Sequence, residues 1–189
     1  CTKRYMQEGD VPTEVLANWP VKNRRHGMLN PIATFCRPVT REEVLASRMV
    51  ADPLTLLQCC PGVVDGAAAL VLSTRPSRGT AKPVRVLASV VQSGLFEIHQ
   101  VDMTEAEITR RAARLAYEQA GVGAGDLSLI ELHDAFTISE LLYYEALGLC
   151  EAGEGPALLA SGATTLGGRI PVNTRGALLA KGHPAGATG

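Results

Sequence analysis

The sequence predicts an α/β fold in which at least some of the strands pair in parallel. Apolar runs of strand length recur along the chain, and each is followed by a turn and then by a segment with helical periodicity. Three segments carry the Ser/Thr-x-x-Glu spacing of a capping box, which marks a helix start. The 189 residues are 46% hydrophobic but only 4% aromatic, so the core is expected to consist mainly of Ala, Val and Leu.

The first forty residues divide into an irregular part and a helix start. Residues 1–38 are expected to be irregular and contain a mixed basic segment, KNRRH, at residues 22–26. Thr40 then opens a helix, because Glu43 stands three residues later and completes a capping box.

Three apolar runs are predicted as strands. They span residues 67–72, 84–91 and 127–132. A Pro- and Gly-containing stretch, residues 73–83, is the predicted linker between the first two. Helices are predicted behind the capping boxes that begin at Thr104 and Thr137. Gly121 and Gly148 are expected to end them.

Charge and cysteine content exclude several classes of protein. The formal net charge of -1 argues against a strongly basic nucleic-acid surface, and no apolar run reaches the length of a membrane span. The five cysteines lack zinc-site spacing, which favours a reduced, cytoplasmic compartment. The adjacent Cys59 and Cys60 are either small buried residues near a strand or reactive thiols, and the first interpretation is favoured.

The segment HDAF at residues 133–136 lies between a predicted strand and a predicted helix start, where open α/β sheets place ligands. A histidine there can donate a hydrogen bond to a developing oxyanion or shuttle a proton, so His133 is a candidate catalytic residue. Asp134 either orients this histidine or assists the helix start, and the second is favoured. Of Tyr143 and Tyr144, at most one faces a site, because adjacent helical residues point about 100° apart.

A second candidate site is the glycine-rich segment GHPAGATG at residues 182–189. Glycines let the backbone approach a ligand closely, and Pro184 fixes the turn beside His183. A histidine held rigidly in such a loop is a candidate catalytic residue. Asn173 and Gly176, just upstream, are expected in the same pocket wall. Neither a metal site nor a permanently bound cofactor is predicted, since no metal-ligand or nucleotide motif is present.

Together, HDAF and GHPAGATG resemble the thiolase superfamily, and more narrowly its sterol-carrier-protein-type thiolases and bacterial lipid-transfer proteins, which carry HDxF where ordinary thiolases carry NEAF. The resemblance covers nearly the whole chain. It implies an αβαβα layered fold of two similar halves. Residues 1–80 would be the end of the N-terminal half, and residues 81–189 the C-terminal half, incomplete at its end. Ala135 departs from the branch, where Cys is frequent.

The resemblance also implies roles for single residues. His183 would activate a cysteine nucleophile that attacks an acyl-CoA thioester, and His133 would line the same oxyanion site. The implied substrate-binding residues are Phe136, Asn173, Gly176, Gly182, Pro184 and Gly186. Coenzyme A is then part of the substrate. The family's nucleophile would lie upstream of residue 1, so the chain is expected to be a fragment that is inactive by itself.

Three functions remain open on these grounds. The favoured one is an acyl-CoA-dependent thiolase-type acyltransferase of lipid or sterol metabolism, which cleaves or forms 3-oxoacyl-CoA. The second is a retro-aldolase of steroid degradation, acting on a steroid side-chain CoA thioester with a DUF35 protein as partner. The third is a non-catalytic lipid-binding subunit. A homodimer is expected, without nucleic acid as a partner.

Overall fold

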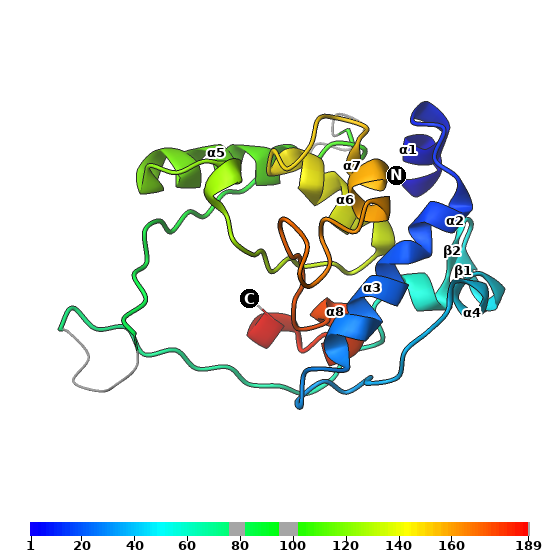
Figure 1. Ribbon diagram of the computed structural model, residues 1–189, viewed down its shortest axis with the longest axis horizontal. Coiled ribbons are helices and arrows are strands. Elements are labelled where there is room, and N and C mark those ends of the chain that lie inside the picture. The colour runs from blue at the N-terminus through cyan, green and yellow to red at the C-terminus, as the bar shows by residue number, and fades with distance from the viewer. Residues whose placement is uncertain (76–81, 95–101, 189) are drawn as a thin grey trace.

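The computed structural model describes residues 1–75, 82–94 and 102–188, and helices predominate in it (Figure 1). The helices and strands are α1 Thr2–Glu8, α2 Thr13–Leu16, α3 Asn18–Gly27, α4 Arg41–Ala46, β1 Met49–Ala51, β2 Leu54–Thr55, α5 Glu107–Ala120, α6 Thr137–Ala146, α7 Gly155–Ala160 and α8 Ala177–Lys181, with short 3₁₀ turns η1 Leu56–Gln58, η2 Ala124–Asp126 and η3 Ala185–Thr188.

The core lies where the N-terminal helices meet α6, α7 and α8 (Figure 1). Its members are apolar or aromatic side chains that are almost fully excluded from solvent, among them Leu16, Trp19, Leu141, Tyr144, Ile170, Val172 and Leu179. Burial of apolar surface is worth about 25 cal/mol per Å², so this cluster is the main apolar contribution to stability. It fixes α3 against α6 and α8, which border the candidate site.

The prediction that residues 1–38 are irregular is wrong, because α1, α2 and α3 occupy most of them. The basic segment at residues 22–26 lies within α3, and most of it is buried rather than solvated. The pattern of apolar residues does not indicate this helix, because its buried face carries polar side chains whose partners lie far away in the sequence.

One predicted capping box is confirmed. The hydroxyl of Thr40 accepts a hydrogen bond from the backbone N–H of Glu43 at 3.2 Å. The carboxylate of Glu43 in turn accepts one from the N–H of Thr40 at 2.8 Å. Two donors at the start of α4 are therefore satisfied reciprocally.

The capping boxes predicted at Thr104 and Thr137 are wrong. The hydroxyl of Thr104 donates to the carboxylate of Asp102 at 2.6 Å, and α5 begins three residues later, at Glu107. Thr137 is itself the first residue of α6. In both cases the threonine has another position or partner, which a local spacing rule cannot detect. The predicted helix end is confirmed at Gly121, which has φ 69°.

Two of the predicted strands are absent from the described residues. The segments at residues 67–72 and 84–91 have no strand pairing there, and their apolar side chains are exposed: Val71 is 91%, Val84 93% and Val91 92% accessible. Figure 1 shows this part of the chain leaving the body as an extended arm. A strand needs a neighbour for its backbone groups, and none lies alongside these segments among the described residues.

Parallel pairing is confirmed only as isolated bridges, and residues 127–132 form no strand. Within the third predicted strand, Ile130 forms a parallel bridge with Val172. Its N–H donates to the carbonyl of Pro171 at 3.0 Å, and its carbonyl accepts from the N–H of Asn173 at 2.8 Å. The sheet that the described residues do form is the antiparallel pair of β1 and β2.

The predicted domain boundary between residues 80 and 81 and part of the linker at 73–83 lie outside the described residues. The division into two halves therefore stays a prediction. Among the helices that the structure describes, none combines the length and the apolar character needed to cross a membrane.

Candidate active site

The two histidines singled out by the sequence lie in contact. The ring centroids of His133 and His183 are 4.8 Å apart, and the rings meet edge to face at 75°. His133 comes from the loop before α6, and His183 follows α8. Partial burial, and secondarily the neighbouring His183, lower the pKa of His133, which favours its neutral imidazole.

A third segment, around Cys59 and Cys60, joins the two histidine loops. Cys59 forms an antiparallel bridge with Phe136, and the N–H of Cys60 donates to the carbonyl of Ala135 at 2.8 Å. Three residues after this pair of cysteines, the chain passes the other loop, where Val63 forms a parallel bridge with His183. This segment therefore runs along both candidate loops.

The thiols of Cys59 and Cys60 are half-buried. Burial raises the pKa of both thiols. The neighbouring Cys60 raises the pKa of Cys59 further, and the nearby Asp134 raises that of Cys60. A raised thiol pKa disfavours the reactive thiolate at neutral pH. This favours the interpretation of both as small packed residues beside the site.

The loop that carries His183 requires glycine at one position. Gly182 has φ 88°, and a Cβ there would lie 2.6 Å from a methyl carbon of Val64. Gly186, by contrast, has open space where a Cβ would stand. The hydroxyl of Thr188 lies 3.3 Å from Nδ1 of His183. Gly189, the last residue of the motif, lies outside the described residues.

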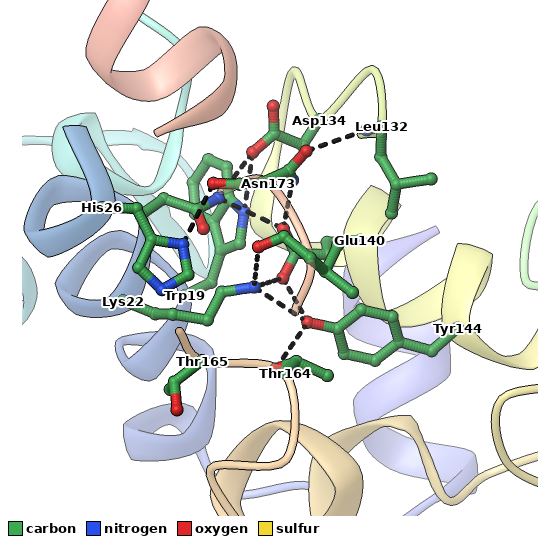
Figure 2. A network of polar contacts seen from close by, with 12 residues as sticks. Trp19, Lys22, His26, Leu132, Asp134, Glu140, Tyr144, Thr164, Thr165 and Asn173 are labelled. Atoms are coloured by element: carbon green, nitrogen blue, oxygen red, sulfur yellow. Dashed lines mark hydrogen bonds and ion pairs between the residues drawn. The ribbon is translucent and has the colours of Figure 1, made fainter. Parts of the chain in front are cut away.

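A buried polar network lies beneath the histidine loops (Figure 2). Asp134 is completely buried and accepts three hydrogen bonds. Oδ2 accepts from Trp19 Nε1 at 3.0 Å and from Asn23 Nδ2 at 2.8 Å, whereas Oδ1 accepts from the N–H of Leu178 at 3.0 Å. Burial, followed by the nearby Glu140, raises the pKa of Asp134. Neither role expected for Asp134 is seen among the described residues: it bonds neither the His133 ring nor the start of α6.

Glu140 is the centre of the same network (Figure 2). It forms a buried ion pair with Lys22 and accepts from the hydroxyl of Tyr144. It also accepts from the side-chain amides of Asn23 and Asn173. Oδ1 of Asn173 accepts from the N–H of Leu132, the residue before His133. The network therefore extends to the backbone of the candidate site.

His26, for which the sequence indicated no partner, also belongs to this interior. Its Nε2 accepts from the N–H of Leu166 at 3.1 Å, so the proton sits on Nδ1, which faces the carbonyl of Asn173 at 3.0 Å. Burial lowers the pKa of His26 and favours the neutral ring. For His99 too the sequence indicates no partner, and this residue lies outside the described residues.

A helical spacing could have revealed the α3 side of the network. Trp19, Lys22, Asn23 and His26 stand at positions i, i+3, i+4 and i+7, which share one face of a helix. All four side chains are buried and hydrogen-bonded. A polar stripe at that spacing, read as a buried face instead of a basic surface, predicts this cluster.

The other predicted site residues lie in two different environments. Phe136 is 44% exposed beside Cys59, and Pro184 is partly exposed in the His183 loop. Asn173 is completely buried within the network. Gly176 packs on α3, because a Cβ there would lie 2.5 Å from the Cα of Gly27. The structure thus places the first two at the surface of the site and the last two beneath it.

Among residues 1–75, 82–94 and 102–188, no three His, Cys, Asp or Glu side chains gather closely enough to hold a metal ion. The arrangement that remains is a pair of imidazoles above a buried, hydrogen-bonded carboxylate network. Neutral imidazole N–H groups in such a position can stabilise negative charge that develops on a carbonyl oxygen.

Comparison with known proteins identifies relatives that match almost the whole of this chain. Benzoylsuccinyl-CoA thiolase subunit BbsB of Thauera aromatica is 49% identical across 99% of this chain and 49% of its own length. Acetyl-CoA acetyltransferase of Methanothermobacter thermautotrophicus is 44% identical across the same shares. Sterol carrier protein 2 of Homo sapiens is 40% identical across 99% of this chain and 36% of its own. The chain thus spans about half the length, or less, of these relatives.

A solved structure supports the same fold. The Ltp2–ChsH2(DUF35) aldolase matches 98% of this chain and 50% of its own chain, with a TM-score of 0.76 and 25% identity. The family model described as "Thiolase C-terminal domain-like" matches residues 92–188, which is over half of the chain. The resemblance noted in the sequence is therefore confirmed, and the chain belongs to the thiolase C-terminal domain-like family.

Proposed function

We propose that the protein containing this chain is a thiolase-type acyltransferase that cleaves or forms 3-oxoacyl-CoA. The observation that carries the proposal is the edge-to-face contact of His133 and His183, whose ring centroids lie 4.8 Å apart. The relatives named as a thiolase and an acetyltransferase support it. Coenzyme A enters as part of the substrate, and a homodimer is part of the proposal.

The two imidazoles have separate tasks in this mechanism. Cleavage begins when a thiolate attacks the 3-keto carbon and the bond between C2 and C3 breaks, leaving the enolate of the shorter CoA thioester. An N–H of His133 donates to the thioester oxygen on which the enolate charge gathers. His183 takes the proton of the attacking thiol. In this proposal the thiol comes from the half of the relatives' length that the chain does not span.

The lowered pKa of His133 suits its proposed task. A neutral imidazole donates a hydrogen bond through one nitrogen without transferring the proton, so the enolate charge is stabilised while its carbon remains reactive. The exposed Phe136 ring and the backbone of the Gly182–Gly186 loop would contact the substrate around this point. Asn173 and Gly176 would act from beneath, by holding the backbone of the site.

A retro-aldolase is the second candidate, favoured by the structural match to the Ltp2–ChsH2(DUF35) aldolase. Retro-aldol cleavage of a 3-hydroxyacyl-CoA also leaves a CoA-thioester enolate, so the same two histidines fit. The difference lies at C3, where a base removes the hydroxyl proton and a ketone or aldehyde departs. A DUF35 protein would then be the partner, and a steroid side-chain CoA thioester the substrate.

The test is an assay of the intact protein with a 3-oxoacyl-CoA plus free CoA, and separately with a 3-hydroxyacyl-CoA of a steroid side chain plus a DUF35 partner. Turnover of the first supports the acyltransferase; turnover of the second alone supports the aldolase. Removing one oxyanion donor lowers kcat by a factor of about 10²–10³, so the kcat of His133→Ala should be lower than wild type by that factor. Loss of a general base costs about 10²–10⁴, which is the fall expected for His183→Ala.

The control is Glu14→Gln, which changes an exposed side chain on α2 and should leave turnover unchanged. Unchanged turnover in His183→Ala would overturn the assignment of the site. No turnover of either substrate, with lipid binding retained, would overturn both enzymatic functions in favour of a lipid-binding subunit.

A further inference from the structure

We propose that Asp134 is a positioning residue that holds His133 and His183 at their mutual distance without touching the substrate itself. The inference rests on the proposed function of the two histidines. It concerns one completely buried carboxylate with three hydrogen-bond donors from two helices (Figure 2).

One oxygen of this carboxylate joins the two histidine loops. Asp134 follows His133 directly in the chain. Its Oδ1 accepts from the N–H of Leu178, in the first turn of α8, at 3.0 Å. The opposite end of α8 leads through Gly182 into His183. A single hydrogen bond therefore fixes the loop of one histidine to the helix that carries the other.

The second oxygen anchors this link to α3. Oδ2 accepts from Trp19 Nε1 and from Asn23 Nδ2, both on α3. The helix α3 in turn packs closely on the start of α8, since a Cβ at Gly176 would lie 2.5 Å from the Cα of Gly27. Two donors on one oxygen, both from the same helix, hold the carboxyl group in one orientation relative to α3, which suits a fixed joint.

The histidine rings depend on such anchors. His133 is exposed, and its ring makes no hydrogen bond among the described residues. Its position is instead set by its neighbours: Leu132, held by the side chain of Asn173, and Asp134. The helix α8 has only five residues, too few for a helix to be stable by itself, so it also needs tertiary contacts to hold its direction.

The test is Asp134→Asn in the intact protein. An asparagine retains one acceptor oxygen, and its NH₂ group must face either the Leu178 N–H or the two donors of α3, so one side of the joint is lost. We expect kcat to fall by about 100-fold with little change in KM, the size expected for a misplacement of about 1 Å. We also expect the pKa of His133, followed by NMR titration of its ring, to rise as the loosened loop becomes less buried and the facing His183 moves away.

The control is Val44→Ala, which truncates a completely buried side chain in a separate apolar cluster with Ala17 and Val39 and leaves every donor to Asp134 in place. It should lower Tm while kcat and the pKa of His133 stay close to the wild-type values. A purely structural role predicts the opposite, namely that both variants affect kcat and the His133 pKa only in proportion to their loss of stability. That result, or an Asp134→Asn protein with wild-type kcat and His133 pKa, would overturn the inference.

If Asp134→Asn does not fold, Leu178→Pro tests the same bond from its donor side, because the first turn of a helix tolerates proline. Leu178→Ala is its match: it loses the same buried side chain but retains the N–H. Only the proline variant should raise the His133 pKa; equal effects overturn the inference. The NMR titration does not depend on turnover. If the wild-type protein shows no activity on CoA thioesters, the proposed function is overturned, and the NMR titration still tests the positioning role of Asp134.

Discussion

Single buried polar residues carry much of the specificity of this interior. Glu140, completely buried, is paired with Lys22 and hydrogen-bonded to two side-chain amides and a tyrosine hydroxyl. A buried charge is tolerated only when it is paired and its remaining hydrogen-bonding capacity is filled. Here the partners come from α3, α6 and the segment around Asn173, so that one carboxylate fixes three parts of the chain.

Lys22→Met should destabilise the protein strongly, because it leaves the charge of Glu140 buried without its partner. The expected loss in the free energy of unfolding is about 3–5 kcal/mol, measured by denaturant titration. Lys3→Met is the matched control: Lys3 pairs with Asp52 at the surface, where both side chains are over 60% exposed, and should change stability little. Equal losses in the two variants would contradict the importance of the buried pair.

His26 should destabilise the folded state as pH falls below about 6.5, the ordinary pKa of histidine. Burial lowers the pKa of His26 in the folded state, so between the unfolded and the folded pKa the unfolded state binds more protons. The pKa of His133 is also lowered and acts in the same direction. A His133→Gln background therefore isolates the effect of His26. We compare the free energy of unfolding at pH 7.5 and at pH 5.5 in that background, with and without His26→Gln. The difference between the two pH values should be smaller with His26→Gln. An undiminished difference would refute the role of His26.

At the scale of single elements, local rules hold where the partners are local. The capping box at Thr40 and the left-handed helix end at Gly121 both depend on atoms within four residues, and both are confirmed. Thr104 also meets the local rule, but its hydroxyl donates to the carboxylate of Asp102 instead. The Thr-x-x-Glu spacing is therefore necessary for a capping box but not sufficient for it.

One prediction at the scale of single elements concerns the loop that carries His183. Gly182→Ala should lower both Tm and activity, because it places a Cβ at φ 88° and 2.6 Å from Val64. The backbone conformation of Gly182, φ 88° and ψ 178°, is one that essentially only glycine adopts, and it alone costs an alanine about 1–3 kcal/mol. Gly186→Ala, in the same loop, has open space and no positive φ, so it should be nearly neutral. Thermal unfolding and turnover of the two variants provide the measurement; similar Tm values would show that the loop adapts freely.

At the scale of the whole molecule, the extended arm stands apart from the body (Figure 1). Val71, Val84 and Val91 are each over 90% exposed. Isolated exposed apolar side chains are common, but a contiguous apolar surface marks a region of association.

The polypeptide of residues 1–189, prepared alone, should therefore self-associate. Replacing Val71, Val84 and Val91 together by Lys should increase the monomer fraction in sedimentation velocity, because charge on an unpaired extended segment opposes strand pairing and apolar association. The double variant Glu118→Lys/Gln119→Lys, at two exposed positions of α5, adds the same amount of positive charge and is the control for net charge. A monomeric wild-type polypeptide would contradict this prediction.

The sequence by itself determined what depends on residue type and short spacing: the two histidine motifs, the family, the α4 cap and the end of α5. Only the tertiary structure decided the rest. It brought His133 and His183 into contact across fifty residues of chain, and it turned the basic segment of α3 into a buried face. It also left the predicted strands at 67–72 and 84–91 unpaired. The physical reason is the same in each case: a buried charge or a strand is stable only with a partner, and those partners lie far away in the sequence.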